Sequence, residues 1–351
     1  MITRRVATAV NIGKVTIGGA APIAVQSMTK TDTRDAAATI AQICQLKDRG
    51  CEIIRVAVPD EEAAKALVSI KKNSPLPVIA DIHFDHRLAL AALRAHVDGL
   101  RLNPGNIRDP NHIAQIVKAA KQRNVPIRIG VNAGSLPPTT KQYDSIARRM
   151  VDAALSEIAL LHKEDFGLIK VSLKAFDVPT TIEAYRIMAK ETPYPLHVGI
   201  TEAGPPKSGT IRSAVGIGIL LHEGIGDTIR VSISADPVEE VDAAWEILRS
   251  LNLRERGPLL ISCPTCGRSE VDILGLIAAV ERELKQIDKP IKVAVMGCVV
   301  NGPGEAREAD VGIACGKGKG VIFRHGEIVQ TVDESNFLQT LLHEIRDLTE
   351  H

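Results

Sequence analysis

The feature that most limits the possible folds is a repeat of strand-like and helix-like segments across the first 235 residues. Short runs rich in β-branched residues are expected as strands at residues 23–28, 53–58, 77–82, 97–102, 126–131, 168–173, 196–201 and 228–233. Helix-period segments lie between or after them, most clearly at 36–49, 61–72, 146–162 and 238–250. Nearly continuous hydrophobic strands that alternate with helices are typical of a parallel sheet covered on its faces. Eight such units predict an α/β fold of the closed (β/α)8 TIM-barrel type, with an open doubly wound sheet as the alternative.

The repeat ends at the polar, turn-rich segment 252–258. Beyond it the pattern predicts a strand at 259–262, a helix at 271–286, a strand at 291–296, a hairpin within 311–332 and a helix at 334–349. We therefore predict two domains, a TIM barrel over residues 1–251 and a small α+β domain over residues 259–351. Residues 10–17, with glycines nearby, are expected to form a hairpin that closes the floor of the barrel.

Composition excludes several classes of function. The 351 residues carry a net charge of +1 and only 3% aromatic residues, which argues against a nucleic-acid-binding surface. There is no apolar stretch of about 18 residues and no secretory leader pattern, so we expect a cytoplasmic protein with no membrane segment. If the protein binds an anion, a local cluster of basic residues must do so, because the molecule as a whole is nearly neutral.

Five of the predicted strands carry a cation between apolar neighbours: Arg55, Arg101, Arg128, Lys170 and Arg230. Side chains two residues apart share a face of a strand, and the residues two positions further on are small or polar. They are Ala57, Asn103, Gly130, Ser172 and Ser232. The bulky residues that normally fill a barrel interior are missing on this face, so we predict a hollow, wet lumen.

Internal ion pairing is the simplest explanation of any one buried cation. Against these five cations we identify two strand-borne acids that could pair with them, Asp81 and Glu202. The surplus predicts an anionic ligand, and a phosphate or diphosphate suits the fork of an arginine. His83, Asn132 and Lys174 lie near strand ends, where the active sites of barrels form.

Lys170 also allows a different chemistry. A lysine on a barrel strand can form a Schiff base if burial or neighbouring cations lower its pKa. A Schiff-base aldolase with a structural zinc domain is therefore one rival function, and a phosphate-binding module without catalysis is another.

The cysteines predict a metal site in the second domain. Cys263 and Cys266 form a C-x-x-C turn, Cys298 follows in a Gly/Pro-rich loop, and Cys315 lies further on. Three thiolates suit zinc or an iron–sulfur cluster equally, and Cys315 could complete an all-cysteine zinc site. The two remaining cysteines, Cys44 and Cys51, are expected to be inert thiols.

Several longer motifs resemble one family. They are Cys263-Pro-Thr-Cys-Gly-Arg, Met296-Gly-Cys-Val-Val-Asn-Gly-Pro-Gly-Glu-Ala, Val25-Gln-Ser-Met-Thr, Ala80-Asp-Ile-His-Phe, Leu102-Asn-Pro-Gly-Asn and Gly130-Val-Asn-Ala-Gly-Ser. In their residues and in their order along the chain, these motifs resemble those of the 4-hydroxy-3-methylbut-2-enyl diphosphate synthases, iron–sulfur enzymes of the non-mevalonate isoprenoid pathway. The likeness covers the whole chain and fits the two-domain bacterial form.

The resemblance implies a [4Fe–4S] cluster held by Cys263, Cys266, Cys298 and Glu305, with Cys315 as a bystander. It implies reductive ring opening and dehydration of 2-C-methyl-D-erythritol 2,4-cyclodiphosphate. The diphosphate would be bound by the residues that match the family pattern, Arg55, Arg101, Arg128, Asn132, Lys170, Arg230 and Ser232. Asp81, His83 and Glu202 match polar residues near the reacting carbons, and Glu202 is a candidate proton relay.

The same resemblance implies partners. Flavodoxin or ferredoxin is expected to donate the electrons. A head-to-tail homodimer is expected to bring the cluster domain of one subunit over the barrel of the other, which would exclude water and oxygen.

Overall fold

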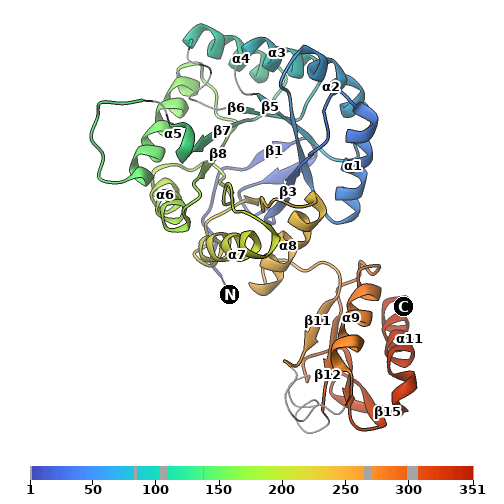
Figure 1. The fold of residues 1–351 in the computed structure, drawn as a ribbon. Coiled ribbons are helices and arrows are strands. Elements are labelled where there is room, and N and C mark those ends of the chain that lie inside the picture. The colour runs from blue at the N-terminus through green and yellow to red at the C-terminus, as the bar shows by residue number, and fades with distance from the viewer. Residues whose placement is uncertain are drawn as a thin grey trace. The chain divides into compact units, whose positions relative to one another are not determined.

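The computed structural model describes residues 2–82, 85–102, 107, 109–136, 138–264, 271–298 and 307–350. Two compact units make up the chain, Met1–Arg254 and Glu255–His351, and each is described by itself (Figure 1).

The first unit is an eight-stranded parallel barrel in the order β8-β7-β6-β5-β4-β3-β10-β9. A parallel bridge between Val171 and Leu196 joins β8 to the segment before β9 and completes the ring. The strands are β3 (Ala24–Met28), β4 (Ile53–Ala57), β5 (Val78–Ile82), β6 (Gly99–Leu102), β7 (Ile127–Asn132), β8 (Ile169–Lys174), β9 (His197–Val198) and β10 (Thr228–Ile229). The predicted closed barrel is therefore confirmed, and the open sheet is wrong.

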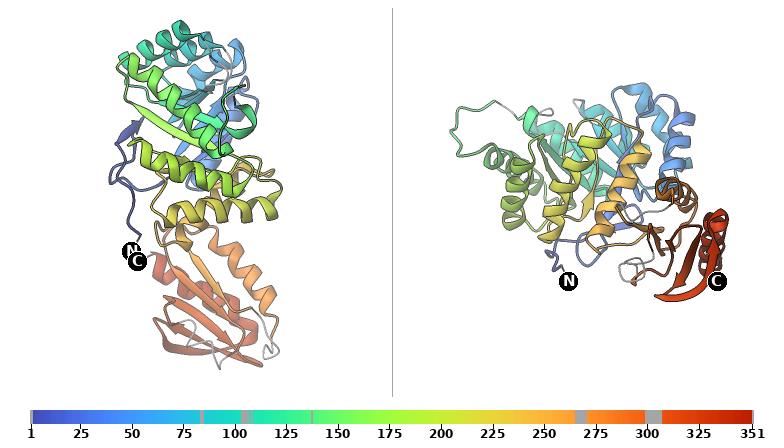
Figure 2. Two further views of the ribbon diagram at one scale, coloured as in Figure 1. Left: turned by 90° about the vertical axis from the view of Figure 1, so that its left-hand side faces the viewer. Right: turned by 60° about the horizontal axis from the view of Figure 1, so that its bottom comes forward.

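Helices surround the strands, as the views in Figures 1 and 2 show. They are α1 (Ala36–Asp48), α2 (Glu61–Asn73), α3 (His86–Arg94), α4 (Pro110–Gln122), α5 (Ile146–Lys163), α6 (Val178–Glu191), α7 (Pro206–His222) and α8 (Pro237–Ser250), with a 3₁₀ turn, η1 (Ala133–Ser135), before α5. An aspartate caps the first turn of six of them, as Asp60 does by accepting a hydrogen bond from the N–H of Ala63. These caps fix the loops at the carboxyl ends of the strands, where barrel sites form.

Two hydrophobic layers hold the barrel together. Outward-facing strand residues such as Ile54 and Val56 pack with helix residues such as Leu67 and Ile70. At the other end of the lumen, the hairpin β1 (Val10–Ile12) and β2 (Val15–Ile17) buries its apolar side chains against the first lumen-facing residues of three strands. Those residues are Ala24, Ile53 and Ile79. The hairpin closes the barrel floor, as expected, so ligands reach the lumen from the opposite end.

The described part of the second unit forms a five-stranded mixed sheet with helices α9 and α11 on one face. The strands β11 (Leu259–Ser262), β12 (Lys292–Met296) and β13 (Val311–Cys315) are parallel, and β14 (Lys319–Arg324) and β15 (Glu327–Asp333) continue as antiparallel neighbours. The helices α9 (Ile273–Leu284) and α11 (Phe337–Glu350), the latter preceded by a 3₁₀ turn, η2 (Glu334–Asn336), share one hydrophobic core with the sheet. Residues 316–318 form the turn between β13 and β14, so the hairpin expected within 311–332 is present.

Candidate functional site

A belt of charged side chains crosses four neighbouring strands of the barrel at one level. Asp81 of β5 is in register with Arg101 of β6, Arg101 with Arg128 of β7, and Arg128 with Lys170 of β8. Registered residues of parallel strands point to the same side of the sheet. All four are buried, so the strand pattern that suggested a charged lumen describes the structure correctly.

Asp81 neutralises part of this belt. Its Oδ1 lies 3.0 Å from Nη1 of Arg101, and its Oδ2 lies 3.4 Å from Nε of Arg55. Burial lowers the pKa of Arg55 to about 10, with Asp81 opposing that effect and Arg230 and Arg101 adding to it. One carboxylate is thus shared by two guanidinium groups.

The next two cations have no carboxylate partner within the described ranges. Nε and Nη1 of Arg128 are buried without any hydrogen-bond partner there. Nζ of Lys170 lies 3.2 Å from Oε1 of Gln26, which is a neutral group. Burial, followed by the charges of Arg128 and Arg55, lowers the pKa of Lys170 well below its ordinary value, and the more distant charge of Asp227 opposes this only in part. Buried cations without counter-charge are costly, so this part of the lumen is built for an anion.

A second carboxylate, which the sequence analysis did not identify, comes from outside the strands. Glu240 of α8 is 1% exposed, and its Oε2 lies 3.3 Å from Nη2 of Arg230. Its Oε1 accepts a hydrogen bond from the N–H of Ile233 and lies 3.1 Å from Nζ of Lys30. Glu240 therefore fixes both Arg230 and the segment that carries Ser232. Only the rarity of a buried glutamate on a helix could have drawn attention to it.

The balance of charge in the lumen is clearly positive. Among the described residues its cations are Arg55, Arg101, Arg128, Lys170, Lys174 and Arg230. Against these stand the carboxylates Asp81 and Glu240. A polyanion such as a diphosphate would supply the missing negative charge.

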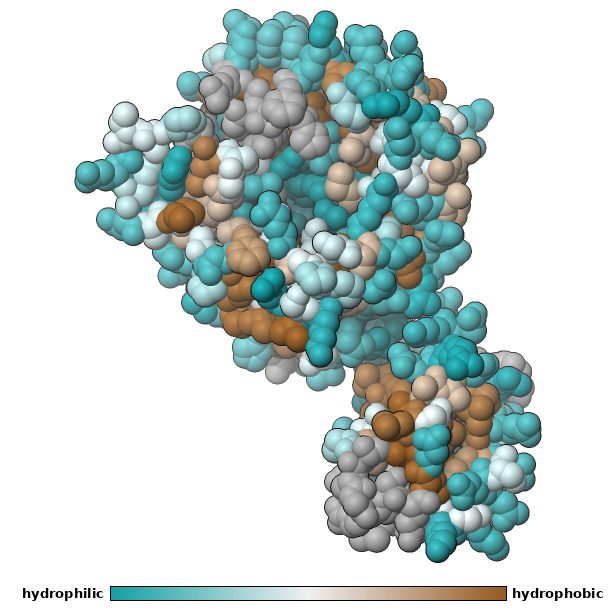
Figure 3. All heavy atoms as spheres, viewed as in Figure 1, coloured by the Kyte–Doolittle hydropathy of each residue, from teal (hydrophilic) through white to brown (hydrophobic). Residues whose placement is uncertain are grey.

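Small residues make room for these long side chains. A Cβ atom on Gly130 would lie 2.6 Å from Nε of Arg101, so a larger residue there would displace that guanidinium. In the space-filling view the centre of the helix ring is hollowed and hydrophilic (Figure 3). The lumen is therefore open to a polar ligand.

The remaining candidates of the barrel lie around its mouth. Asn132 ends β7 and Ser232 follows β10, and both are half-buried. Glu202 was expected on a strand, which is wrong. It lies in an exposed bend after β9, because that strand pairs only over His197–Val198. His83 lies outside the described residues.

The bend around Glu202 is nevertheless held firmly. Glu202 has φ +53°, a left-handed conformation that costs energy for a residue with a side chain. Nη1 of Arg212 donates to the carbonyl of Ala203 at 2.8 Å, and the N–H of Ser234 donates to that of Gly204 at 2.9 Å. These hydrogen bonds hold the backbone of the two residues that follow Glu202 and so fix the bend in which Glu202 lies.

In the second unit, two cysteines follow neighbouring parallel strands at the same edge of the sheet. Cys263 follows β11 and Cys298 follows β12, and these strands are parallel neighbours. The backbone N–H of Gly297 donates a hydrogen bond to Sγ of Cys263 at 3.1 Å, which links the ends of β11 and β12. Cys266 and Glu305, the other two expected ligands, lie outside the described residues. The described part of this edge fits a thiolate-ligated metal centre.

Cys315 lies at the end of the next parallel strand, β13, and is fully buried. Burial, and then the nearby Cys263, raise the pKa of its thiol to about 12. The bystander role expected of Cys315 stays a prediction.

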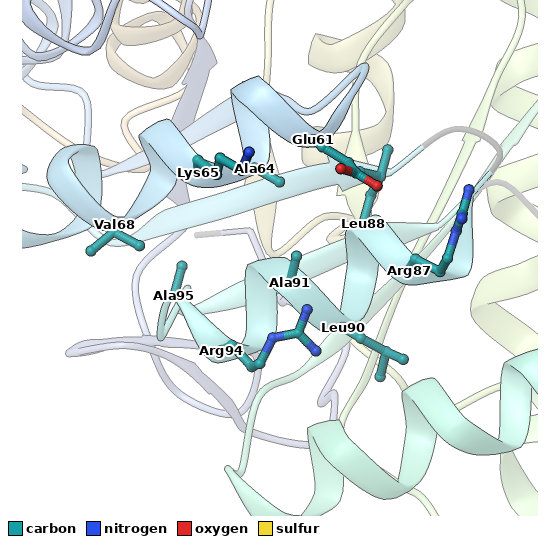
Figure 4. A pocket seen from close by; sticks show the side chains of 10 residues that line it. All are labelled: Glu61, Ala64, Lys65, Val68, Arg87, Leu88, Leu90, Ala91, Arg94 and Ala95. Carbon is teal, nitrogen blue, oxygen red and sulfur yellow. The ribbon is translucent and has the colours of Figure 1, made fainter.

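A separate groove lies on the outside of the barrel between α2 and α3 (Figure 4). Its lining includes Lys65, Val68, Arg87, Leu90 and Arg94. None of the site residues expected from the sequence lines it, so it is distinct from the lumen.

Fold and site together define a TIM-barrel protein with a cationic lumen, joined to an α+β unit that carries thiols at the ends of parallel strands. The model of the GcpE TIM-barrel domain matches residues 7–245, and that of the GcpE C-terminal domain matches residues 259–347. The chain therefore belongs to the GcpE family.

Curated relatives agree over the full length. A protein of Dehalococcoides mccartyi named 4-hydroxy-3-methylbut-2-en-1-yl diphosphate synthase (flavodoxin) is 65% identical over 99% of this chain and 100% of its own. Proteins of the same name from Maridesulfovibrio salexigens and Geobacter sulfurreducens are each 56% identical. The former alignment covers 98% of this chain and 97% of the relative, the latter 97% of each. The family resemblance inferred from the motifs is confirmed.

Solved structures show the barrel fold. Dihydropteroate synthase of Yersinia pestis has a TM-score of 0.52 at 10% identity and covers 70% of this chain and 98% of its own. An N-acetylneuraminic acid synthetase of Leptospira borgpetersenii also scores 0.52, at 12% identity, over 80% of this chain and 100% of its own. At such low identity these likenesses concern the fold alone.

Proposed function

We propose that this protein converts 2-C-methyl-D-erythritol 2,4-cyclodiphosphate to 4-hydroxy-3-methylbut-2-enyl diphosphate, in the formation of isoprenoid precursors by the non-mevalonate pathway. The observation that carries the proposal is the uncompensated positive charge of a lumen inside a chain that is 65% identical to a synthase of that name. The reaction opens the ring, releases one water and consumes two electrons and two protons. It is an oxidoreduction, so the protein needs a redox centre.

The lumen supplies the binding energy. Arg55, Arg101, Arg128, Lys170 and Arg230 surround the space in which the two phosphate groups would lie, and Asn132 and Ser232 add neutral donors at the mouth. Arg128, whose buried Nε and Nη1 have no partner among the described residues, is suited to bidentate contact with phosphate oxygens. Asp81 orients two of the arginines, so its charge is already committed.

We further propose that the second unit holds a [4Fe–4S] cluster on Cys263, Cys266, Cys298 and Glu305. When bound, such a cluster delivers electrons and offers one iron as a Lewis acid if a weak carboxylate ligand leaves. The N–H of Gly297 donates a hydrogen bond to Sγ of Cys263 and so orients that sulfur. Lys170 and its arginine neighbours stabilise the negative charge that forms on the departing phosphate oxygen.

Glu202 is proposed to move a proton at the mouth. Its carboxyl group is exposed, and its backbone is held in a strained conformation by the contacts of the neighbouring residues. Strain that the surroundings maintain is typical of functional positions. His83 is proposed as a further polar contact to the substrate.

The working protein is proposed to be a cytoplasmic homodimer that receives electrons from flavodoxin, as the names of its relatives suggest, or from ferredoxin. Within the described ranges, no helix combines the length and the apolar character that crossing a bilayer requires. Three apolar residues of α7, Ile211, Val215 and Ile219, are 58%, 48% and 37% exposed and follow one another every four positions. Such a stripe supports contact with a second subunit.

Anaerobic purification followed by iron and zinc analysis, visible and EPR spectra, and turnover with reduced flavodoxin tests the proposal. We expect about four irons per chain, a cluster absorption band and product formation. A colourless protein with one zinc would refute the proposal, and covalent trapping of Lys170 by borohydride with a carbonyl substrate would establish the aldolase. Glu305→Cys should keep the cluster colour and suppress turnover, and undiminished activity would show that no ligand has to leave.

Sedimentation velocity tests the dimer. Val215→Lys places a charge in the α7 stripe and is expected to shift the protein towards a monomer, whereas Lys207→Met on the same helix should leave its mass unchanged. A monomeric unmodified protein would refute the dimer.

A further inference from the structure

The seam of the barrel, where its first strand meets its last, is paired over a short stretch. Within the described ranges, β3 and β10 pair over two residues of each strand. The pairing ends at Ile229, although Arg230 and Ser232, two of the proposed diphosphate ligands, follow directly. We call residues 230–235 the arm. Because main-chain pairing with β3 stops before the arm begins, side chains have to hold the arm on this side.

Lys30, in the loop after β3, reaches across the seam. Its Nζ lies 3.1 Å from Oε1 of Glu240 and donates to the carbonyl oxygen of Ile233 at 3.1 Å. It also donates to the carbonyl oxygen of Ala235. An ammonium group has three donors and no acceptor, so these three acceptors satisfy it completely. Lys30 therefore joins the loop after the first barrel strand to the arm after the last one.

Lys30 also changes the charge balance around Arg230. Glu240, which contacts Arg230 and the N–H of Ile233, is 1% exposed, whereas the side chain of Lys30 is 36% exposed. A buried carboxylate needs its charge compensated. Arg230 alone would supply that compensation at the expense of its own attraction for an anion. Since Lys30 shares Glu240, one carboxylate stands against two cations, and Arg230 keeps positive charge for a ligand.

The loop that carries Lys30 is itself anchored. The backbone N–H of Lys30 donates to Oε1 of Gln42, in α1, at 2.7 Å. One residue earlier, the N–H of Thr29 donates to the carbonyl oxygen of Arg55 at 3.1 Å. A lysine side chain loses much conformational entropy when it is held in one geometry, so these contacts have to outweigh that loss. The anchored backbone reduces the cost, because it places the side chain opposite its acceptors.

We propose that Lys30 is a positioning residue for the reaction. Through Glu240 and the two carbonyl groups it holds the arm so that Arg230 and Ser232 are directed at the diphosphate. Lys30 itself does not touch the substrate. This inference rests on the function proposed above, because it concerns the placement of two ligands of the proposed anion site.

Calorimetric titration of the cluster-loaded protein with inorganic pyrophosphate, under anaerobic conditions, tests the inference. Lys30→Met is expected to weaken binding about 3- to 10-fold, because the arm loses its tether and Glu240 is left with Arg230 alone. Lys30→Arg can donate to the same acceptors and should bind nearly as the unmodified protein does. The matched control is Lys47→Met, which removes an exposed lysine from the last turn of α1 and should leave the affinity unchanged.

Steady-state kinetics separate positioning from a general loss of structure. With reduced flavodoxin and the cyclic diphosphate, Lys30→Met should raise KM by a similar factor and leave kcat and the iron content nearly unchanged. Combined with Arg230→Met, it should add little to the loss that Arg230→Met causes alone, since Lys30 acts through the arm. Full additivity of the two losses would overturn the positioning role.

Stability distinguishes a positioning residue from a structural one. A lower melting temperature of Lys30→Met with unchanged pyrophosphate affinity would show that the contact at the seam is structural only. If Lys30→Met does not fold, Lys30→Gln, which keeps a donor for one carbonyl group, should show a smaller loss in the same direction. If the unmodified protein does not bind pyrophosphate, the anion site itself is wrong and this inference fails with it. If it binds and Lys30→Met binds equally well, only the inference fails.

Discussion

The barrel lumen and the thiol edge of the second unit are built in opposite ways. The lumen collects one side chain from each of many strands, and residues as distant in sequence as Gln26 and Lys170 come into contact there. The thiol edge depends on short motifs placed directly after two adjacent parallel strands, β11 and β12. The lumen therefore depends on barrel closure and register, whereas the thiol edge depends on local sequence. The two regions should respond independently to mutation.

Loss of a thiol should give the largest effect and should spare the lumen. Cys298→Ala is expected to abolish iron binding and to reduce turnover by more than about 1,000-fold, because a missing ligand removes the redox centre. Pyrophosphate affinity, measured by calorimetry, should not change. Cys315→Ala is the matched control, since it removes a neighbouring thiol and should retain iron. Iron loss in both variants would mean that Cys315 is a ligand.

Loss of a lumen cation should weaken substrate binding and leave the metal site intact. Arg128→Met is expected to leave the iron content and the visible spectrum intact. It should lower kcat/KM about 100-fold, because a bidentate contact to phosphate disappears. Steady-state kinetics with reduced flavodoxin and an iron assay on the same preparation measure both. A changed cluster spectrum would show that the two regions are not independent.

A smaller change should disturb the belt of charges without removing one. In Gly130→Ala the new methyl group would lie 2.6 Å from Nε of Arg101. We expect a loss of about 1 to 3 kcal/mol in unfolding free energy, together with weaker pyrophosphate binding. Gly134→Ala is the control, because a Cβ atom there has no neighbour within 4 Å. Equal stability of the two variants would contradict the tight fit of Arg101.

The smallest expected effect is a pH dependence of the unfolding free energy that comes from His197 in the barrel. In the folded protein, burial and then the charge of Lys174 lower the pKa of His197, a buried residue of β9, well below its ordinary value of 6.5. Below pH 6.5 the unfolded chain therefore binds a proton that the folded protein does not, and stability falls as the pH falls. Between pH 7.5 and 5.5 the unmodified protein should lose about 1 kcal/mol relative to His197→Gln in urea unfolding. A constant difference between the two proteins across this range would show that His197 is not held neutral.

Much of the fold could be predicted from the chain because its signals are periodic. Helix α1 begins at the expected residue, and α5 ends within one residue of the prediction. The strands β9 and β10 were expected to be six residues long but pair over only two. Pairing length depends on neighbouring strands, and no local pattern contains that information. For the same reason Glu202 was placed on a strand that had already ended.

The eight-unit repeat, the cations on one face of the strands and the cysteine motifs could be recognised from the chain, since each is a local pattern of residue types. The distribution of charge, in contrast, followed only from the folded structure. That structure placed Glu240 of α8 beside Arg230, gave Asp81 to two arginines at once, and set His197 against Lys174. The physical reason is that ion pairing and burial depend on distances between residues far apart in the chain, and closure of the barrel sets those distances.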